Sequence, residues 1–326
     1  MKKYLLLSLS ILVLIIGMCL YKNYSINMYQ KDFYYMDTMI NVKLYTTSSK
    51  ADNLFKKIDD TYKKYQDMTN VYNENSELYK INNSSLATDK IKVSDELYDI
   101  LKISLEHSKI NSKFNINMHK IIEVWKKYRD KGEGIPTSEE LENAKESIND
   151  FTLYDTKEIS NTNPSIDLGA VAKGYATKKV AELLKGNNIK SYIINAGGNV
   201  VVGEAYHKDY FTVGVENPTD TSSLYAKIKV NNKSVVTSGG YLRFYEYNGK
   251  KYHHIIDPDT LYPANNMLSV TVVTEDSALA DILSTSLFLL EPNDAIKLVE
   301  SLDDVEAIIY TNDSKILKTK GFSKYE

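Results

Sequence analysis

Two oxygen-bearing side chains, those of Asp281 and Thr285, stand four residues apart in the last fifth of this 326-residue chain. Apolar residues recur about once per turn over residues 278–290, and this spacing predicts a helix. Residues four apart lie on one face of a helix. A carboxylate one turn from a hydroxyl is an all-oxygen arrangement that suits a hard cation such as Mg²⁺. Because such pairs also occur in helices that bind nothing, the assignment needs support from other segments.

A second candidate site lies in residues 167–175, DLGAVAKGY, where a turn leads into a predicted helix over residues 170–184. Free backbone amides at the start of a helix favour phosphates and other anions. Lys173 adds a point charge that could reach the same anion, and Asp167 could accept a hydroxyl or ring N–H from a nucleotide. The alternative is an ordinary helix start with Lys173 in solvent.

A third segment, HHIIDPDT, offers groups that could move a proton. Histidine exchanges a proton near neutral pH, but neighbouring residues of a strand point to opposite faces, so His253 and His254 cannot both serve one site. Asp257 precedes a proline, which restricts it to an extended or turn conformation. Surface histidines are the alternative. The chain contains no HExxH or paired CxxC, Walker or GxGxxG motif, which disfavours a zinc enzyme and the common nucleotide-binding folds.

Strands and helices alternate along the rest of the chain. Strands are predicted at 33–45, 191–194, 200–203, 210–215, 226–230, 234–236, 269–274, 306–310 and 316–318, with a hairpin over 241–256 around Asn248-Gly249. Helices are predicted at 50–65, 95–108, 121–128, 139–148, 170–184, from 278 after an N-cap in 275–277, and at 294–302. Without repeats or long linkers, residues 32–326 are expected to form a single compact α+β domain of mixed and antiparallel sheets with packed helices.

The amino terminus predicts export. Lys2 and Lys3 precede an apolar run from residue 5 to residue 20, which is typical of a signal peptide or membrane anchor. Cys19, the only cysteine, could end a lipoprotein signal. An uncut anchor and a simple export signal are the alternatives, and all three place the domain outside the cytoplasm at the cell membrane. Residues 21–31 are expected to be a polar tether. The net charge of −3 argues against nucleic-acid binding.

Five segments follow one another along the chain in this order: DLGAVAKGYA, INAGGN, VTSGGY, HHIIDPDT and SVTVVTEDSALADILSTSLF. Together they resemble the ApbE family, the FAD:protein FMN transferases. The resemblance continues through MDTMINVKLY, YNENSELYKIN and residues 114–125, so it covers nearly the whole chain after the tether. Each motif alone is weak evidence for the family, whereas all five in the family's order are specific evidence. The resemblance implies an ApbE-like, T-fold-like domain.

The resemblance also implies a Mg²⁺-dependent enzyme of the bacterial envelope. Such an enzyme attaches the FMN half of FAD to a Thr or Ser hydroxyl of a partner protein and releases AMP; the expected acceptor motif is Ser/Asp-Gly-x-Ser/Thr-Gly-Ala-Thr. His254 matches the histidine that activates the hydroxyl, and Asp257 is the second choice. The residues implied to contact FAD are Met36, Tyr72, Lys113, Phe114, Asn115, Asp167, Lys173 and Ile256; those implied at the metal are the Ala170 carbonyl, Asp281, Thr285 and Ser284.

Four positions depart from the family pattern. Asn115 replaces an acidic residue, Leu261 and Asp37 each replace a glycine, and Ser284 stands where some members carry a second aspartate. These departures could alter a nucleotide contact, two turns and the number or affinity of metal ions. Two other functions remain open: an FAD pyrophosphatase that uses water as the acceptor, and an FAD-binding lipoprotein with little turnover.

Overall fold

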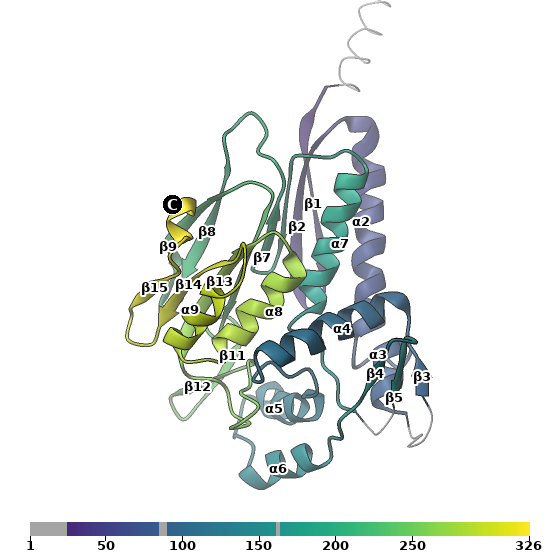
Figure 1. The fold of residues 1–326 in the computed structure, drawn as a ribbon, viewed down its shortest axis with the longest axis vertical. Helices are drawn as coiled ribbons and strands as arrows, with labels where there is room; N and C mark the ends of the chain where they lie inside the picture. The colour runs from purple at the N-terminus through teal and green to yellow at the C-terminus, as the bar shows by residue number, and fades with distance from the viewer. Residues whose placement is uncertain (1–24, 85–89, 161–163) are drawn as a thin grey trace, which may run out of the picture.

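The computed structural model describes residues 25–84, 90–160 and 164–326. Within them, an eight-stranded antiparallel sheet forms the centre of the molecule (Figure 1). Its strands, in spatial order, are β1 (Asn27–Tyr35), β2 (Thr38–Thr46), β6 (Tyr192–Ala196), β7 (Asn199–Val202), β10 (Lys233–Gly239), β13 (Met267–Thr274), β14 (Glu306–Thr311) and β15 (Ile316–Lys318). The prediction of a single α+β domain is confirmed.

Both faces of the central part of this sheet are covered. Adjacent residues of a strand point to opposite faces, and in the central strands both are buried. Val235 and Ile308 pack with a hairpin on one face, whereas Val236 and Ile309 pack with helices on the other. The hairpin consists of β8 (Phe211–Asn217) and β9 (Asp220–Val230), and η1 (Phe322–Tyr325) packs beside it on the same face. The helices of the opposite layer are α2 (Ser48–Thr69), α7 (Ala172–Gly186), α8 (Ser277–Phe288) and α9 (Pro292–Glu300).

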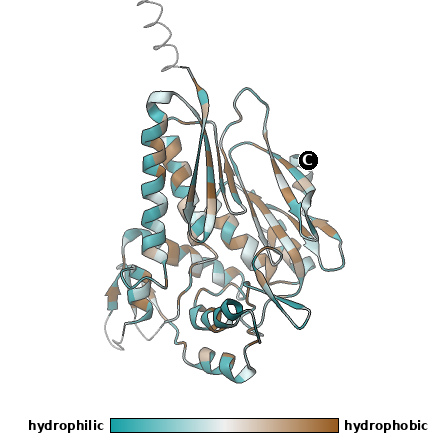
Figure 2. Cartoon of the chain, turned by 180° about the vertical axis from the view of Figure 1, so that it is seen from behind, coloured by the Kyte–Doolittle hydropathy of each residue, from teal (hydrophilic) through white to brown (hydrophobic). Residues whose placement is uncertain are grey.

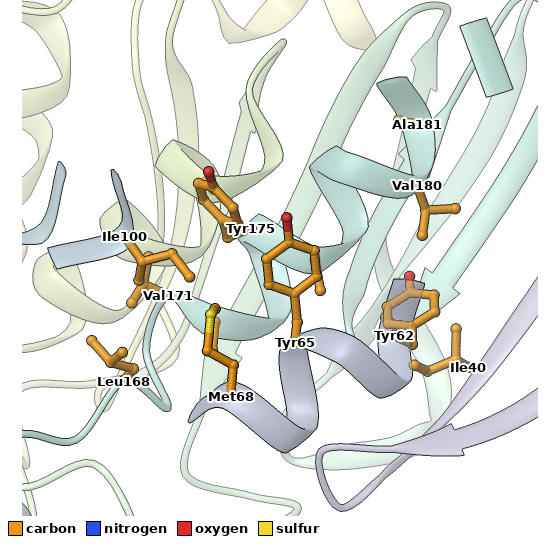
Figure 3. Packing of buried hydrophobic residues seen from close by; sticks show 14 of the residues in the cluster. Ile40, Tyr62, Tyr65, Met68, Ile100, Leu168, Val171, Tyr175, Val180 and Ala181 are labelled. Carbon is orange, nitrogen blue, oxygen red and sulfur yellow. The ribbon is translucent and has the colours of Figure 1, made fainter. Parts of the chain in front are cut away.

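The apolar core between the sheet and the helices α2 and α7 holds the start of α7 in place. Leu168 and Val171, in the turn before α7, lie beside Ile100 in Figure 3. Tyr65 of α2 and Tyr175 of α7 pack edge to face, with ring centroids 5.4 Å apart. In Figure 2 the outward face of α2 is mostly hydrophilic, as expected for an amphipathic surface helix. This packing fixes the segment that carries Asp167 and the start of α7 that carries Lys173.

A group of further helices and small strands covers one end of the sheet, in the lower part of Figure 1. They are α3 (Glu77–Asn82), β3 (Lys90–Lys92), α4 (Asp95–Ile110), α5 (His119–Lys131), α6 (Ser138–Glu146), β4 (Leu153–Tyr154), β5 (Glu158–Ser160), β11 (Phe244–Tyr247) and β12 (Lys250–His253). Trp125 of α5 stacks on Tyr252 of β12 at 5.7 Å and donates its Nε1–H to the carbonyl of Leu261 (2.7 Å). These contacts attach α5 to the segment that follows β12.

The first predicted strand is wrong in one respect, because residues 33–45 form two strands. Met36 and Asp37 have φ angles of 52° and 55°, the left-handed pair that a two-residue hairpin turn requires. Met-Asp gives no sequence signal for such a turn. The strand β1 also begins at Asn27, so the last five residues of the predicted tether belong to the sheet edge. The remaining predicted elements are present with ends shifted by up to six residues, the largest shift being at the start of β9.

The predicted signal or anchor over residues 1–20, including Cys19, lies outside the described residues. Within the described part of the chain, no helix combines the length and apolar character needed to cross a bilayer.

Candidate active site

The carboxylate of Asp281 is the centre of the site. Asp276 caps α8 by accepting the N–H groups of Ala278 and Leu279 (2.8 and 3.2 Å), as the sequence predicts. One turn further on, the buried Asp281 carboxylate faces the start of α7. Its Oδ1 accepts a hydrogen bond from the Lys173 ammonium (3.1 Å), and its Oδ2 accepts one from the N–H of Gly174 (2.7 Å). The two segments predicted to bind a cation and an anion are therefore in direct contact.

Gly174 permits this contact between α7 and α8. A Cβ at Gly174 would lie 2.5 Å from Asp281 Cβ and 2.5 Å from the carbonyl oxygen of Ser277. Among the described residues, the Gly174 N–H donates to Asp281 and not to the carbonyl of Ala170, four residues earlier. The Ala170 carbonyl, just before the N-cap residue Val171, accepts no backbone N–H among the described residues and keeps its lone pairs.

Three hydroxyl groups contact one another, two on α8 within about one turn after Asp281 and one at the end of β10. Ser238, at the end of β10, places its Oγ 2.8 Å from Ser284 Oγ and 3.2 Å from Thr285 Oγ1. Ser284 Oγ donates to the Asp281 carbonyl (3.0 Å), so it must accept from Ser238, and Ser238 in turn accepts from Thr285. This directional chain leaves the lone pairs of the half-buried Thr285 hydroxyl available to a ligand.

These groups fit a hard cation. In the described ranges no three His, Cys, Asp or Glu side chains are close enough to hold a metal ion, so a cation here would depend on one carboxylate together with hydroxyl and carbonyl oxygens. Asp281, Thr285 and the Ala170 carbonyl are oxygen donors of that kind, and Mg²⁺ prefers such ligands over nitrogen or sulfur. The donor set therefore suits Mg²⁺ and not zinc.

The two adjacent histidines have different roles. His253 Nδ1 accepts the N–H of Ile255 (3.2 Å) and its Nε2 donates to the Ala264 carbonyl (2.7 Å), so both ring nitrogens are occupied. His254 Nδ1 lies 3.2 Å from the carbonyl of Arg243. Because a carbonyl only accepts, His254 Nδ1 carries the proton and Nε2 keeps its lone pair. Burial lowers the pKa of His254 to about 4, which keeps the ring neutral at pH 7.

A small pocket adjoins His254. Its walls come from α5, the β11–β12 hairpin and the residue before Asp257, and it is lined by Ile122, Trp125, Arg129, Tyr245, Tyr252, His253, His254 and Ile256. Ile256 packs in the same aromatic core as Trp125, so its side chain forms part of the wall.

Asp257 is engaged on both of its oxygens. Oδ2 accepts from the Lys113 ammonium (2.7 Å), and Oδ1 accepts from the N–H of Asp259 (2.9 Å). The hydrogen bond to Asp257 raises the pKa of Lys113. The ion pair ties the segment before α5 to the segment after β12. It also makes His254, with its free Nε2, the better candidate for a base.

The nucleotide-contact residues predicted before α7 differ in their exposure. Tyr72 is 53% exposed. Asp167 Oδ1 accepts the N–H of Gly169 (2.8 Å), which leaves the other carboxylate oxygen available. Asn115 caps the N–H of Asn117 (2.8 Å), whereas Phe114 is 2% exposed and packs on the ring of His107. The Phe114 side chain is thus a core residue, and ligand contact at this position would use the backbone.

The amino-acid sequence of this chain is similar to a known protein family. The profile described as "ApbE family" matches residues 36–309. This chain belongs to the ApbE family. It is 31% identical over 245 residues to an FAD:protein FMN transferase of Klebsiella pneumoniae, covering 72% of this chain and 75% of that protein. It is 30% identical to an FAD:protein FMN transferase of Haemophilus influenzae, covering 75% of each.

Solved structures agree on the ApbE fold. The flavin transferase ApbE of Vibrio cholerae superimposes with a TM-score of 0.82 at 22% identity, covering 92% of this chain and 100% of that one. The ApbE protein of Thermotoga maritima gives a TM-score of 0.83 at 24% identity, covering 92% and 99%.

Two of the departures from the ApbE pattern preserve the backbone that glycine would supply. Leu261 has a φ of 62° and Asp37 a φ of 55°, so both stay left-handed although they carry a side chain. Leu261 is buried and its N–H donates to the Asp257 carbonyl (2.8 Å). Asp37 pairs with Arg243 (3.1 Å). The third departure, Ser284, replaces a carboxylate with a hydroxyl in the chain that runs from Ser238.

Three residues that contact this candidate site were not predicted from the sequence. Ser238 lies within VTSGGY, so the motif was visible but its contact with α8 was not. Arg243 binds both His254 and Asp37, and Gln66 accepts the N–H of Met36 (2.8 Å). Neither contact has a local sequence signal, because each joins residues distant in the chain.

Proposed function

We propose that this chain transfers the FMN half of FAD to a Thr or Ser hydroxyl of an acceptor protein and releases AMP. Membership of the ApbE family and the similarity to proteins named FAD:protein FMN transferase support this proposal. The observation that carries it is the contact between the predicted cation-binding residue of α8 and the predicted anion-binding segment at the start of α7. The buried Asp281, an oxygen ligand for a cation, lies within hydrogen-bonding distance of Lys173 at the start of α7, where a pyrophosphate is favoured.

The proposed cofactor is Mg²⁺, held by Asp281, Thr285 and the Ala170 carbonyl, with the Ser284 hydroxyl beside them. Such an ion supplies charge neutralisation to the pyrophosphate. Lys173 would add a positive charge to the same phosphates. The proposed contacts to the rest of FAD are Met36, Tyr72, Lys113, the backbone at Phe114, Asn115, Asp167 and Ile256.

His254 is the proposed base, because a Thr hydroxyl is a poor nucleophile until its proton is removed. The hydroxyl oxygen of the acceptor forms a bond to the phosphorus of the FMN half while its proton moves to His254 Nε2. The bond between that phosphorus and the bridging oxygen breaks, and AMP leaves with this oxygen. The Arg243 carbonyl, which binds Nδ1–H, holds the ring in the tautomer that can accept the proton.

We also propose that the reaction takes place outside the cytoplasm at the cell membrane. The charged start and apolar run of residues 1–20 support this location, and Cys19 is the proposed lipid attachment site. The proposed partner is an extracytoplasmic protein that carries a Ser/Asp-Gly-x-Ser/Thr-Gly-Ala-Thr motif.

A single incubation tests the proposal. The full chain is mixed with FAD, Mg²⁺ and an acceptor domain that carries this motif, and the acceptor is then analysed by mass spectrometry and in-gel flavin fluorescence. A fluorescent acceptor with the FMN mass increment is the expected result, and replacing the acceptor Thr with Val should abolish it. Free FMN and AMP without an adduct would indicate a pyrophosphatase, and bound, unchanged FAD would indicate a storage protein.

A further inference from the structure

His119, the first residue of α5, carries a buried ring nitrogen with incomplete hydrogen bonding. Its Nδ1 is enclosed and has no hydrogen-bond partner among the described residues. Buried polar atoms of folded proteins are nearly always hydrogen-bonded, so an exception requires a reason. The Oδ2 atom of Asp167 lies 3.8 Å away, just beyond hydrogen-bonding distance and within reach of a small movement.

Both neighbours of the His119 ring belong to the proposed FAD site. Tyr72 packs edge to face against it, with ring centroids 5.7 Å apart, and Lys126 Nζ lies 5.4 Å from the centroid of the Tyr72 ring. The N–H of His119 donates to the Ser165 carbonyl (2.8 Å), two residues before Asp167. The backbone of His119 is therefore hydrogen-bonded to the segment that leads to Asp167.

Asp167 already uses one oxygen. Its Oδ1 accepts the Gly169 N–H, and its own N–H donates to the Ile116 carbonyl (2.7 Å). A second donor on Oδ2 would fix the plane of the carboxylate, because both oxygens would then be held. Each oxygen would still have a lone pair for a ligand.

We propose that His119 is a positioning residue of the FAD site, whose Nδ1–H holds Asp167 Oδ2 while the carboxylate accepts an N–H from a heterocycle packed on Tyr72. This inference rests on the proposed function, since it takes FAD as the ligand. Both the adenine amino group and the flavin imide are N–H donors on a planar ring, so the shared chemistry is a planar heterocycle that donates an N–H.

Two substitutions separate the ring nitrogen from the ring surface. H119F keeps a planar ring against Tyr72 and lacks Nδ1, whereas H119N keeps a donor near the Nδ1 position and lacks the ring. FAD affinity of the full chain is measured by isothermal titration calorimetry, with circular dichroism as the check on folding. We expect H119F to bind FAD about tenfold more weakly and H119N to stay within about threefold of the unmodified chain.

A double-mutant cycle with D167N tests the route of the effect. If His119 acts through Asp167, adding H119F to D167N weakens FAD binding no further. Equal and additive losses in both backgrounds would overturn the proposal, because they would mean that His119 supports only the local packing. Failure of H119N to restore affinity would overturn it for the same reason.

Titration with FMN and with ADP identifies the ring. If H119F loses affinity for FMN alone, the flavin is the ring that packs on Tyr72 beside Asp167. If it loses affinity for ADP alone, that ring is the adenine. A loss for neither ligand overturns the inference. If the unmodified chain does not bind FAD, the proposed function fails. If it binds FAD and H119F binds equally well, the proposed function stands and the role of His119 is wrong.

Discussion

A histidine can act as a base only while one ring nitrogen keeps its lone pair. In His254 the Arg243 carbonyl engages Nδ1 and so reserves Nε2 for the substrate. In the neighbouring His253 both nitrogens are bound by backbone groups. The same residue type at adjacent positions therefore provides one candidate catalytic group and one structural group.

We expect H254A to lower the rate of FMN transfer by about 10²- to 10⁴-fold, the range typical of removing a general base. FAD affinity should change little, because the base acts on the acceptor hydroxyl. Initial rates of acceptor flavinylation and calorimetric FAD titration measure the two effects. H207A, at an exposed histidine, is the matched control, and an equal rate loss in both variants would refute the assignment.

The acidic limb of the pH–rate profile should lie well below neutral pH. Burial lowers the pKa of His254 from 6.5 to about 4, so the imidazole is already neutral at pH 5 and above. The transfer rate should therefore stay level from about pH 8 to pH 5 and fall about tenfold per pH unit below 4. Rates are measured with folding monitored by circular dichroism at each pH. A decline that begins near pH 6.5 would show that His254 titrates normally.

At the scale of elements, the site depends on how closely α7 approaches α8. G174A would place a methyl group 2.5 Å from Asp281 Cβ and from the Ser277 carbonyl, and overpacking of this kind costs about 1–3 kcal/mol of unfolding free energy. FMN transfer should fall as well, because the helices carry Lys173 and Asp281.

The control for this prediction lies in the same helix. A Cβ at Gly186 would meet no atom within 4 Å, so G186A should leave both stability and activity nearly unchanged. Urea unfolding and flavinylation rates compare the two variants. If G174A were as stable and as active as G186A, the close approach of α7 to α8 would be unnecessary.

The joint between α4 and α8 should make the protein less stable in mild acid. His107 is buried and its Nε2 lies 2.9 Å from Ser286 Oγ, and burial lowers its pKa from 6.5 to about 4. Between these values the unfolded chain binds a proton that the folded chain does not, so stability falls as pH falls. The His107 contribution should amount to a loss of about 2 kcal/mol between pH 7.5 and pH 5.

The variant H107Q isolates this effect, because glutamine can donate to Ser286 and does not titrate. Unfolding free energies from urea melts at pH 7.5 and pH 5 should fall less in H107Q than in the unmodified chain. H207Q, at the exposed histidine, should keep the original pH dependence. A parallel pH dependence in H107Q and the unmodified chain would contradict the prediction.

Local features of the site could be predicted from the sequence, and long-range contacts could not. The cap at Asp276 and the shared face of Asp281 and Thr285 follow from spacing within one helix. The Ser238 contact requires β10 to pack against α8, and the hairpin turn at Met36 requires a backbone conformation that its residue type disfavours. His119 carried no signal either, because its neighbours Tyr72 and Asp167 are distant in the chain.

At the scale of the whole molecule, the sheet is buried on both sides at its central strands and largely exposed at its edge strands β1 and β15. Its central strands therefore read as nearly continuous apolar runs, and the sequence alone could not tell which residue faces which layer. Ile308 packs toward the β8–β9 hairpin and Ile309 toward α8 and α9. The apolar cores on the two faces of the sheet both include residues of β10, β13 and β14. The hairpin layer and the helical layer should therefore unfold together.

We therefore expect I308A and I309A each to lower the unfolding free energy by about 2–5 kcal/mol, the usual cost of truncating a buried isoleucine. Ile316 of β15 is 44% exposed, so I316A should cost less than about 1 kcal/mol. Urea melts followed by both tyrosine fluorescence and far-ultraviolet circular dichroism should give a single coincident transition for each variant. An I308A protein as stable as I316A would mean that the hairpin layer does not support the sheet, and separate transitions would mean that the two faces of the sheet unfold independently.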